Sequence, residues 1–266
     1  MIDHRADDVY ASDFASTPRG DGVRDLTMTD RWNTPLGRPN GGYILATMLR
    51  GLGEEIGGAD PLVAAITYHA APENGAAQIA ARPVRIGRRV QTGDAVLTQG
   101  EKVVAQLTAS FATRTEGARV QLGTPPQLRS PAQYPDPRDH GMPSGGIFDR
   151  VDYRLPRAPG FVVGKPSGDP SFEIWQRRSD GGIADFPTLA FLCDSFVPPA
   201  LELGDDVPHS MTVQLTAHFH RLPTTPWVAT RIGTRHVHDG FHEEDCELWD
   251  EHGHLLAQSR QLAMIV

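Results

Sequence analysis

The chain has 266 residues, of which 39% are hydrophobic and 22% charged, a composition typical of a globular protein with a sizeable core. Its 25 basic and 33 acidic residues give a net charge of −8, which argues against nucleic acid as a partner because phosphate binding needs a basic surface. No apolar run is long enough to cross a bilayer, so we expect no membrane partner.

The N-terminus and the cysteine content both indicate a cytoplasmic protein. The segment "MIDHRADDVYASDF" has acidic residues where a signal peptide would have a basic region followed by an apolar run. The two cysteines, Cys193 and Cys246, are too few for a disulfide framework, which fits a reducing compartment.

The first predicted elements are one apolar helix and four strands. The helix is expected from Gly41 to Leu52, with Asn40 as its N-cap and Gly53 as its C-terminal stop. The strands are expected at residues 62–70, 77–87, 90–99 and 102–113. In the last strand, alternation predicts one face made of Val103, Ala105, Leu107, Ala109 and Phe111.

A proline-rich segment follows these strands. Residues 115–150 show little periodicity, which predicts an extended linker packed along the surface. Its prolines include Pro125, Pro126, Pro131, Pro135, Pro137 and Pro143. We therefore divide the chain into an N-terminal unit (1–114), a linker (115–150) and a C-terminal unit (151–266).

The C-terminal unit repeats landmarks of the N-terminal one at a nearly constant offset. "TYHAAP" matches "HFHRLP", so that Tyr68 corresponds to Phe219, 151 residues later. "EKVVAQLTASFA" matches "GHLLAQSRQLAM" at an offset of 152 residues. An apolar helix candidate precedes each set of strands, and the second, "FPTLAFLCDSFVPP", is expected to stop at Pro198 and Pro199. These matches indicate a duplicated unit, in which a curved antiparallel sheet wraps around one helix and the linker joins both sheets into one.

The second copy is polar where the first is apolar. Alignment of the last strands places Ser259 and Gln261 at the positions of Leu107 and Ala109, on the face that should meet the helix. The second helix also carries Asp194, whereas "YILATMLRG" has no acid. Burying an unpaired carboxylate is costly, so we infer that Asp194, Gln261 and a water satisfy one another in a functional site. The alternative is that Asp194 is exposed and that Gln261 caps a strand end.

The chain resembles the double-hotdog acyl-CoA thioesterases of the thioesterase II type. The resemblance rests on "NGGYILA", "ITYHAAP…VVAQLTASF", "LCDSF…AL", "MTVQLTAHFHR" and "LLAQSRQ", which cover both halves but neither the linker nor the first thirty residues. It implies an α+β double hotdog, two tandem units each with an antiparallel sheet wrapped around one central helix. It also implies that Asp194, Thr212 and Gln261 bind and activate a water that attacks the thioester carbonyl, and it favours a homo-oligomer.

Thr212 does not fit simple alternation. It is grouped with Gln214 and Thr216, so an inward Val213 would turn Thr212 outward. Thr212 can join the site only if the strand begins with a bulge or an irregular turn, and Ser210 is the substitute candidate.

Two further segments are candidates for substrate binding. In "NGG", Asn40, Gly41 and Gly42 open the first helix, where backbone N–H groups suit an oxyanion or a thioester carbonyl; the alternative is a plain N-cap. "RPVRIGRR" can hold the phosphates of coenzyme A, or its arginines merely face solvent, and these are Arg82, Arg85, Arg88 and Arg89.

We expect no metal and no cofactor. "HVHDGFH" lacks the acid that metallohydrolase spacing needs at position 240, where Gly240 stands, and the repeat places this segment in a solvated turn. Cys193 has no histidine placed by motif to activate it as a nucleophile.

The sequence therefore predicts an enzyme of lipid metabolism that hydrolyses a fatty acyl-CoA to the free acid and CoA through an activated water. The acyl tail is expected among Leu45, Met48, Leu49, Phe191 and Phe196. One alternative is a non-catalytic acyl-CoA-binding protein. An enoyl-CoA hydratase is disfavoured because it needs a histidine five residues after the aspartate, where this chain has Pro199.

Overall fold

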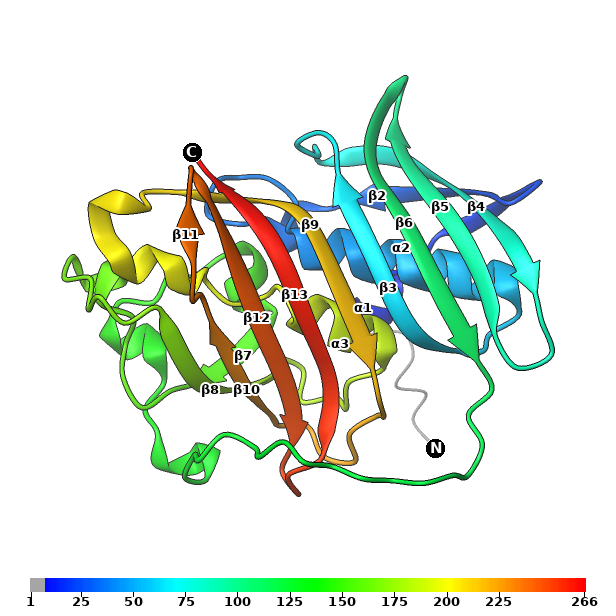
Figure 1. Ribbon diagram of the computed structural model, residues 1–266. Helices are drawn as coiled ribbons and strands as arrows, with labels where there is room; N and C mark the ends of the chain where they lie inside the picture. The colour runs from blue at the N-terminus through cyan, green and yellow to red at the C-terminus, as the bar shows by residue number, and fades with distance from the viewer. Residues whose placement is uncertain (1–7) are drawn as a thin grey trace.

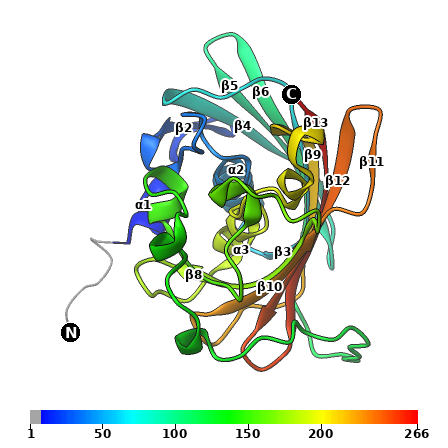
Figure 2. The ribbon, with the colours of Figure 1, turned by 90° about the vertical axis from the view of Figure 1, so that its left-hand side faces the viewer.

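Two helices lie on the concave side of one continuous antiparallel sheet (Figures 1 and 2). The structure is a computed structural model that describes residues 8–266. Residues 1–7, which belong to the segment analysed above for a signal peptide, lie outside the described residues. None of the described helices is long and apolar enough to cross a membrane.

The helices are α1 (Val9–Asp13), α2 (Gly41–Ile56) and α3 (Phe186–Leu192). The strands in chain order are β1 (Thr17–Gly20), β2 (Val23–Met28), β3 (Asp60–Tyr68), β4 (Gly75–Ile86), β5 (Gln91–Gln99), β6 (Lys102–Ala112), β7 (Val151–Arg154), β8 (Ser171–Arg178), β9 (Ser210–Phe219), β10 (Val228–Gly233), β11 (Val237–His238), β12 (Phe241–Asp250) and β13 (Leu255–Ile265). Short 3-10 helices lie at Asp30–Trp32, Pro131–Gln133, Pro137–His140, Gly146–Asp149, Gly160–Val163 and Pro199–Asp206.

The sheet is built from two similar halves that meet at the pair of β3 and β9. Its order is β1-β2-β4-β5-β6-β3-β9-β13-β12-β10-β8-β7, with β11 paired to β12. The predicted architecture is thereby confirmed, including the single sheet that joins both units. However, two strands precede each helix, β1 and β2 before α2 and β7 and β8 before α3, and the repeat landmarks did not predict them.

Both helices have boundaries that differ from the prediction. Asn40 caps α2 by accepting the Tyr43 N–H at 3.0 Å, but the helix continues through Gly53 to Ile56 and ends at Gly57, whose φ of 104° is the left-handed conformation. Helix α3 ends at Leu192, well before Pro198. Asp194 therefore lies in the turn after the helix and not within it.

The inner face of the sheet and the two helices enclose the main hydrophobic core. Sixteen-residue α2 is the central element, and its side chains are buried on most sides, as expected for a helix surrounded by a sheet. Near its start the Tyr43 ring stacks on Trp32, and the Trp32 ring meets Phe191 of α3 edge to face. These rings join α2 to α3 beside the turn that carries Asp194.

Irregular pairing near the start of β6 changes which of its side chains face the core. In β6 the register shifts between Leu97 and Thr98 of β5, so Val104 is buried and Val103 is 40% exposed. The predicted face was therefore wrong at Val103 but right from Ala105 onward. The extra residue of a β-bulge explains the change of face.

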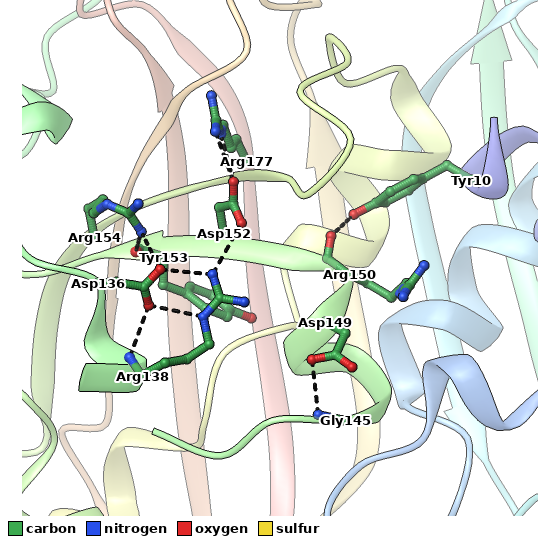
Figure 3. Close-up of polar contacts among 10 residues, drawn as sticks. All are labelled: Tyr10, Asp136, Arg138, Gly145, Asp149, Arg150, Asp152, Tyr153, Arg154 and Arg177. Carbon is green, nitrogen blue, oxygen red and sulfur yellow. Dashed lines mark hydrogen bonds and ion pairs between the residues drawn. The ribbon is translucent and has the colours of Figure 1, made fainter. Parts of the chain in front are cut away.

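The segment between β6 and β7 runs along the outside of the C-terminal half (Figure 1). It covers a second, smaller apolar cluster on the outer face, made of Tyr134, Trp175, Ala229 and Trp249. Its end is attached by charged side chains (Figure 3): Asp136 accepts from Arg138 at 2.8 Å and lies 3.4 Å from Arg154 of β7. The Arg138 guanidinium lowers the pKa of Asp136 to about 2. The exact boundaries 1–114, 115–150 and 151–266 stay a prediction.

Candidate active site

Asp194 lies where the end of α3 meets the beginning of α2. Its Oδ2 accepts the Gly42 N–H at 2.7 Å, and Asn40 Nδ2 lies 3.4 Å from the same oxygen. Asn40 Nδ2 also donates to the Asp194 carbonyl oxygen at 2.8 Å, in the turn that follows α3. The N-terminus of one helix thus holds the acid that follows the other.

Burial sets the protonation of Asp194. Desolvation raises its pKa to about 6, while the hydrogen bonds from Gly42, Gln261 and Asn40 act in the opposite direction. The group therefore changes charge near neutral pH, as a general base must in order to accept a proton and release it again.

The two glycines of "NGG" are required by close approach and not by unusual backbone angles. A Cβ at Gly41 would lie 2.8 Å from Asp194 Oδ2, and a Cβ at Gly42 would lie 2.6 Å from the Phe191 carbonyl oxygen. Gly42 N–H is occupied by Asp194, and Asn40 uses its side-chain oxygen and nitrogen within the protein. These two residues therefore hold the carboxylate, and of the three only Gly41 has an N–H without an acceptor among residues 8–266.

Thr212 reaches the inner face through a bulge. In the pairing of β13 with β9, Leu262 lies opposite Gln214 but Ala263 lies opposite Thr212, so Val213 is the extra residue. Thr212 Oγ1 donates to Gln261 Oε1 at 2.8 Å. This is the irregularity that the assignment of Thr212 required. The substitute candidate, Ser210, instead forms a 2.7 Å hydrogen bond with His242 Nε2.

Gln261 connects this threonine to the acid. It is 5% exposed on the inner face of β13, and its side chain favours the charged form of Asp194. Its Nε2 donates to Glu244 Oε1 on the neighbouring strand β12. Asp194, Thr212 and Gln261, which the sequence suggested separately, thus form one polar cluster together with Glu244, in which Gln261 and Glu244 are buried and Asp194 and Thr212 are half-buried.

Two residues of this region were missed by the sequence analysis. Tyr68 Oη donates to the Gly41 carbonyl at 2.7 Å, and both burial and Asp194 raise the pKa of Tyr68. Glu244 is the second. The repeat held a signal for both: Tyr68 aligns with apolar Phe219, and Glu244 aligns with Gly93, because the pair Glu244 and Gln261 occupies the register position of Gly93 and Ala109.

The predicted phosphate-binding arginines are not brought to this cluster. Gly93, next to them in β5, would place a Cβ 2.8 Å from Leu52 and Ile56, so the hairpin lies at the C-terminal end of α2. Asp194 lies at the other end of this 16-residue helix, which is about 24 Å long. All four side chains are exposed, and they are Arg82, Arg85, Arg88 and Arg89.

The histidine-rich segment forms the β11–β12 hairpin, with Asp239 and Gly240 at φ of 50° and 81° in its turn. The predicted turn is present, but His242 is only 2% exposed, so the segment is not uniformly solvated. Residues 8–266 contain no cluster of three or more His, Cys, Asp or Glu side chains suited to a metal ion.

The five side chains expected around the acyl tail are all packed in the main core.

The chain matches both sequence profiles of one family, the acyl-CoA thioesterase N-terminal domain over residues 28–112 and the C-terminal domain over residues 125–265. An uncharacterised protein of Mycobacterium tuberculosis is 24% identical over 226 residues, 77% of this chain and 76% of its own. A proposed thioesterase II of Thermobifida fusca is 26% identical with a TM-score of 0.84 over 97% of both chains. A hotdog-fold protein of unknown function from Alicyclobacillus acidocaldarius, 24% identical over 97% of both chains, has a TM-score of 0.86 and confirms the fold.

Proposed function

The chain belongs to the acyl-CoA thioesterase family, and we propose on this basis that it hydrolyses a fatty acyl-CoA to the free acid and CoA. One observation supports this reaction above all others. A half-buried carboxylate with a pKa of about 6, held by Gly42 N–H at 2.7 Å, lies beside a hydroxyl–amide pair that can orient a water.

Asp194 serves as the general base. It takes a proton from the water as the water oxygen forms a bond to the thioester carbonyl carbon, which gives a tetrahedral oxyanion. Collapse of this intermediate breaks the carbon–sulfur bond, and the departing thiolate of CoA takes the proton back from Asp194. The Thr212–Gln261 pair holds the water, with the Gln261 amide adjacent to Asp194.

The developing oxyanion is received by the N-terminus of α2. Gly41 N–H is the first donor of a 16-residue helix, whose dipole places positive potential at this end. Its neighbour Gly42 N–H instead orients Asp194. The two adjacent amides thus have different tasks, one toward the substrate and one toward the base.

The active form is proposed to be a homo-oligomer in the cytoplasm. Exposed apolar side chains adjoin one another on the outer face of β9, β12 and β13, where Met264 lies opposite both Met211 and Phe241. Size-exclusion chromatography with light scattering should give the molar mass of a dimer or larger species. Met264→Glu should lower this molar mass toward that of a monomer. A monomeric wild-type protein at micromolar concentration would contradict this proposal.

The reaction itself is tested by mixing the protein with a panel of acyl-CoAs and following free thiol and enoyl absorbance. Thiol release, at a rate proportional to protein concentration, is expected for at least one chain length. Saturable binding without thiol release would make the protein an acyl-CoA binder, and loss of enoyl absorbance without thiol would make it a hydratase; either result would overturn the proposal.

A further inference from the structure

Glu244 is a buried acid that the proposed reaction does not use. It lies on the inner face of β12, directly opposite Gln261 in the register of β12 with β13, and it is 3% exposed. Its Oε1 accepts a hydrogen bond from Gln261 Nε2. Through Gln261 it is one residue removed from both Thr212 and Asp194.

This contact determines how the Gln261 amide is oriented. An amide presents a donor at one end and an acceptor at the other, and the two ends differ little in shape. Glu244 accepts from the nitrogen, while Thr212 Oγ1 donates to the oxygen at 2.8 Å. Reversal of the amide would bring its oxygen to Glu244 Oε1, where a hydrogen bond would then require the Glu244 proton on that oxygen. Glu244 and Thr212 together therefore favour the observed orientation of the group that lies next to Asp194.

The surroundings of Glu244 favour its neutral form. Burial is the largest cause that raises its pKa well above the ordinary value, and Asp194, Asp245 and Glu243 add to the increase. The nearby buried thiol of Cys246 offers no positive charge. The environment of Glu244 therefore opposes a second negative charge beside Asp194.

The second oxygen of Glu244 has no partner. Its Oε2 is buried and makes no hydrogen bond to any group in residues 8–266. An unpaired buried polar atom destabilises the folded state, so the position is not explained by stability. At the matching position of the N-terminal unit the chain has Gly93, packed against Leu52 and Ile56. The acid thus occurs in the half that carries the other polar residues.

We propose that Glu244 is a positioning residue, whose Oε1 accepts from Gln261 Nε2 and holds this amide in the orientation that serves the water. The inference rests on the proposed thioesterase activity. It predicts that an acceptor oxygen at position 244 is needed, but that a negative charge is not.

The test compares two variants by steady-state thiol release. Glu244→Gln keeps a neutral acceptor oxygen and should retain kcat within about threefold of wild type, whereas Glu244→Met removes the acceptor and should lower kcat by about 10–100-fold with little change in KM, as for other residues that orient a functional group. Asp245→Asn is the matched control, because Asp245 is on the outer face of the same strand, paired with Arg260, and should leave kcat unchanged.

A second readout separates positioning from folding. Glu244→Gln should keep the acidic limb of its pH–rate profile near pH 6, the pKa of Asp194, because the surroundings of Glu244 favour its neutral form. Movement of that limb to lower pH would mean that Glu244 is charged in the wild-type protein and would overturn the inference, as would normal kcat in a folded Glu244→Met. Loss of activity in Glu244→Gln would also overturn it. Wild-type protein inactive on every acyl-CoA would refute the proposed function first, and the inference with it.

Discussion

Gly42 N–H and Asp194 Oδ2 are 2.7 Å apart, although the two residues belong to different copies of the repeat. The N-terminal unit supplies the helix end that orients the carboxylate, and the C-terminal unit supplies the carboxylate, Thr212 and Gln261. The cluster therefore forms only where both units meet. The pairing of β3 with β9 joins the two sheets and so helps to keep α2 and α3 in place relative to each other.

The activity should depend on pH through Asp194. Its pKa of about 6 is higher than usual because of burial, and only the charged form accepts a proton from water. We expect kcat/KM for thiol release to be low below pH 5, to increase through about pH 6 and to level off above pH 7. A profile with its acidic limb near pH 4 would indicate a solvated carboxylate and contradict the site described here.

The same pKa predicts how stability depends on pH. Since the folded-state pKa of Asp194 exceeds its unfolded value, the folded protein binds more protons between about pH 4 and pH 6, and the contribution of Asp194 to the free energy of unfolding decreases as pH rises through that range. The increase in the pKa of Asp194 from its ordinary value to about 6 corresponds to about 3 kcal/mol in the free energy of unfolding.

Asp194→Asn should remove this loss, so the variant should gain stability relative to wild type as pH rises from 4 to 7. Urea unfolding of both proteins at each pH measures the difference. If the difference in the free energy of unfolding between the two proteins does not change across this pH range, Asp194 has an ordinary pKa.

The glycine at position 42 should tolerate no side chain. In Gly42→Ala the new methyl would meet the Phe191 carbonyl at 2.6 Å, which pushes the end of α3 away from α2 and breaks the bond to Asp194. We expect a loss of about 1–3 kcal/mol in stability, as for other overpacked sites, and at least a tenfold loss of kcat. Gly117→Ala is the control, because nothing lies within 4 Å of its new methyl. Equal behaviour of the two variants would count against the close packing at Gly42.

Much of this fold follows from local sequence patterns, but the site does not follow from them alone. The helix start at Asn40, the strands from Leu62 to Ala112 and the duplication are encoded in caps, alternation and repeated landmarks, and the structure contains all of them. Strands β1 and β2 lay in a region without such landmarks. Helix ends were misplaced because Gly53 tolerates a helical conformation when packed against Phe111, whereas Gly57 adopts a left-handed one.

The site depended on features that act across the chain. The sequence shows that Thr212 can face the site only if its strand contains an irregularity. The position of that irregularity, at Val213, is determined by the pairing of β9 with β13. The occupation of Gly42 N–H by Asp194 depends on how two residues 152 positions apart in the chain approach each other, which no local pattern encodes. The repeat carries part of this information, because Glu244 and Tyr68 stand where the other copy has an apolar side chain or none.

The hydroxyl of Thr212 should matter more than its shape. Thr212→Val keeps the branched side chain but leaves Gln261 Oε1 without its donor, and we expect kcat to fall by about tenfold and stability to fall by about 1–2 kcal/mol. Thr212→Ser retains a hydroxyl and should keep kcat within a few fold of wild type. If valine and serine give the same rate, the hydrogen bond to Gln261 has no part in turnover.

The role of Asp194 as the general base is tested by measuring thiol release from acyl-CoA in the variant Asp194→Asn. The substitution keeps the size of the side chain and an oxygen for the Gly42 N–H, but it removes the group that accepts the proton. We expect kcat to fall by about two to four orders of magnitude while the variant stays folded and binds acyl-CoA as tightly as wild type. A folded Asp194→Asn protein that releases thiol at a near-normal rate would contradict this role.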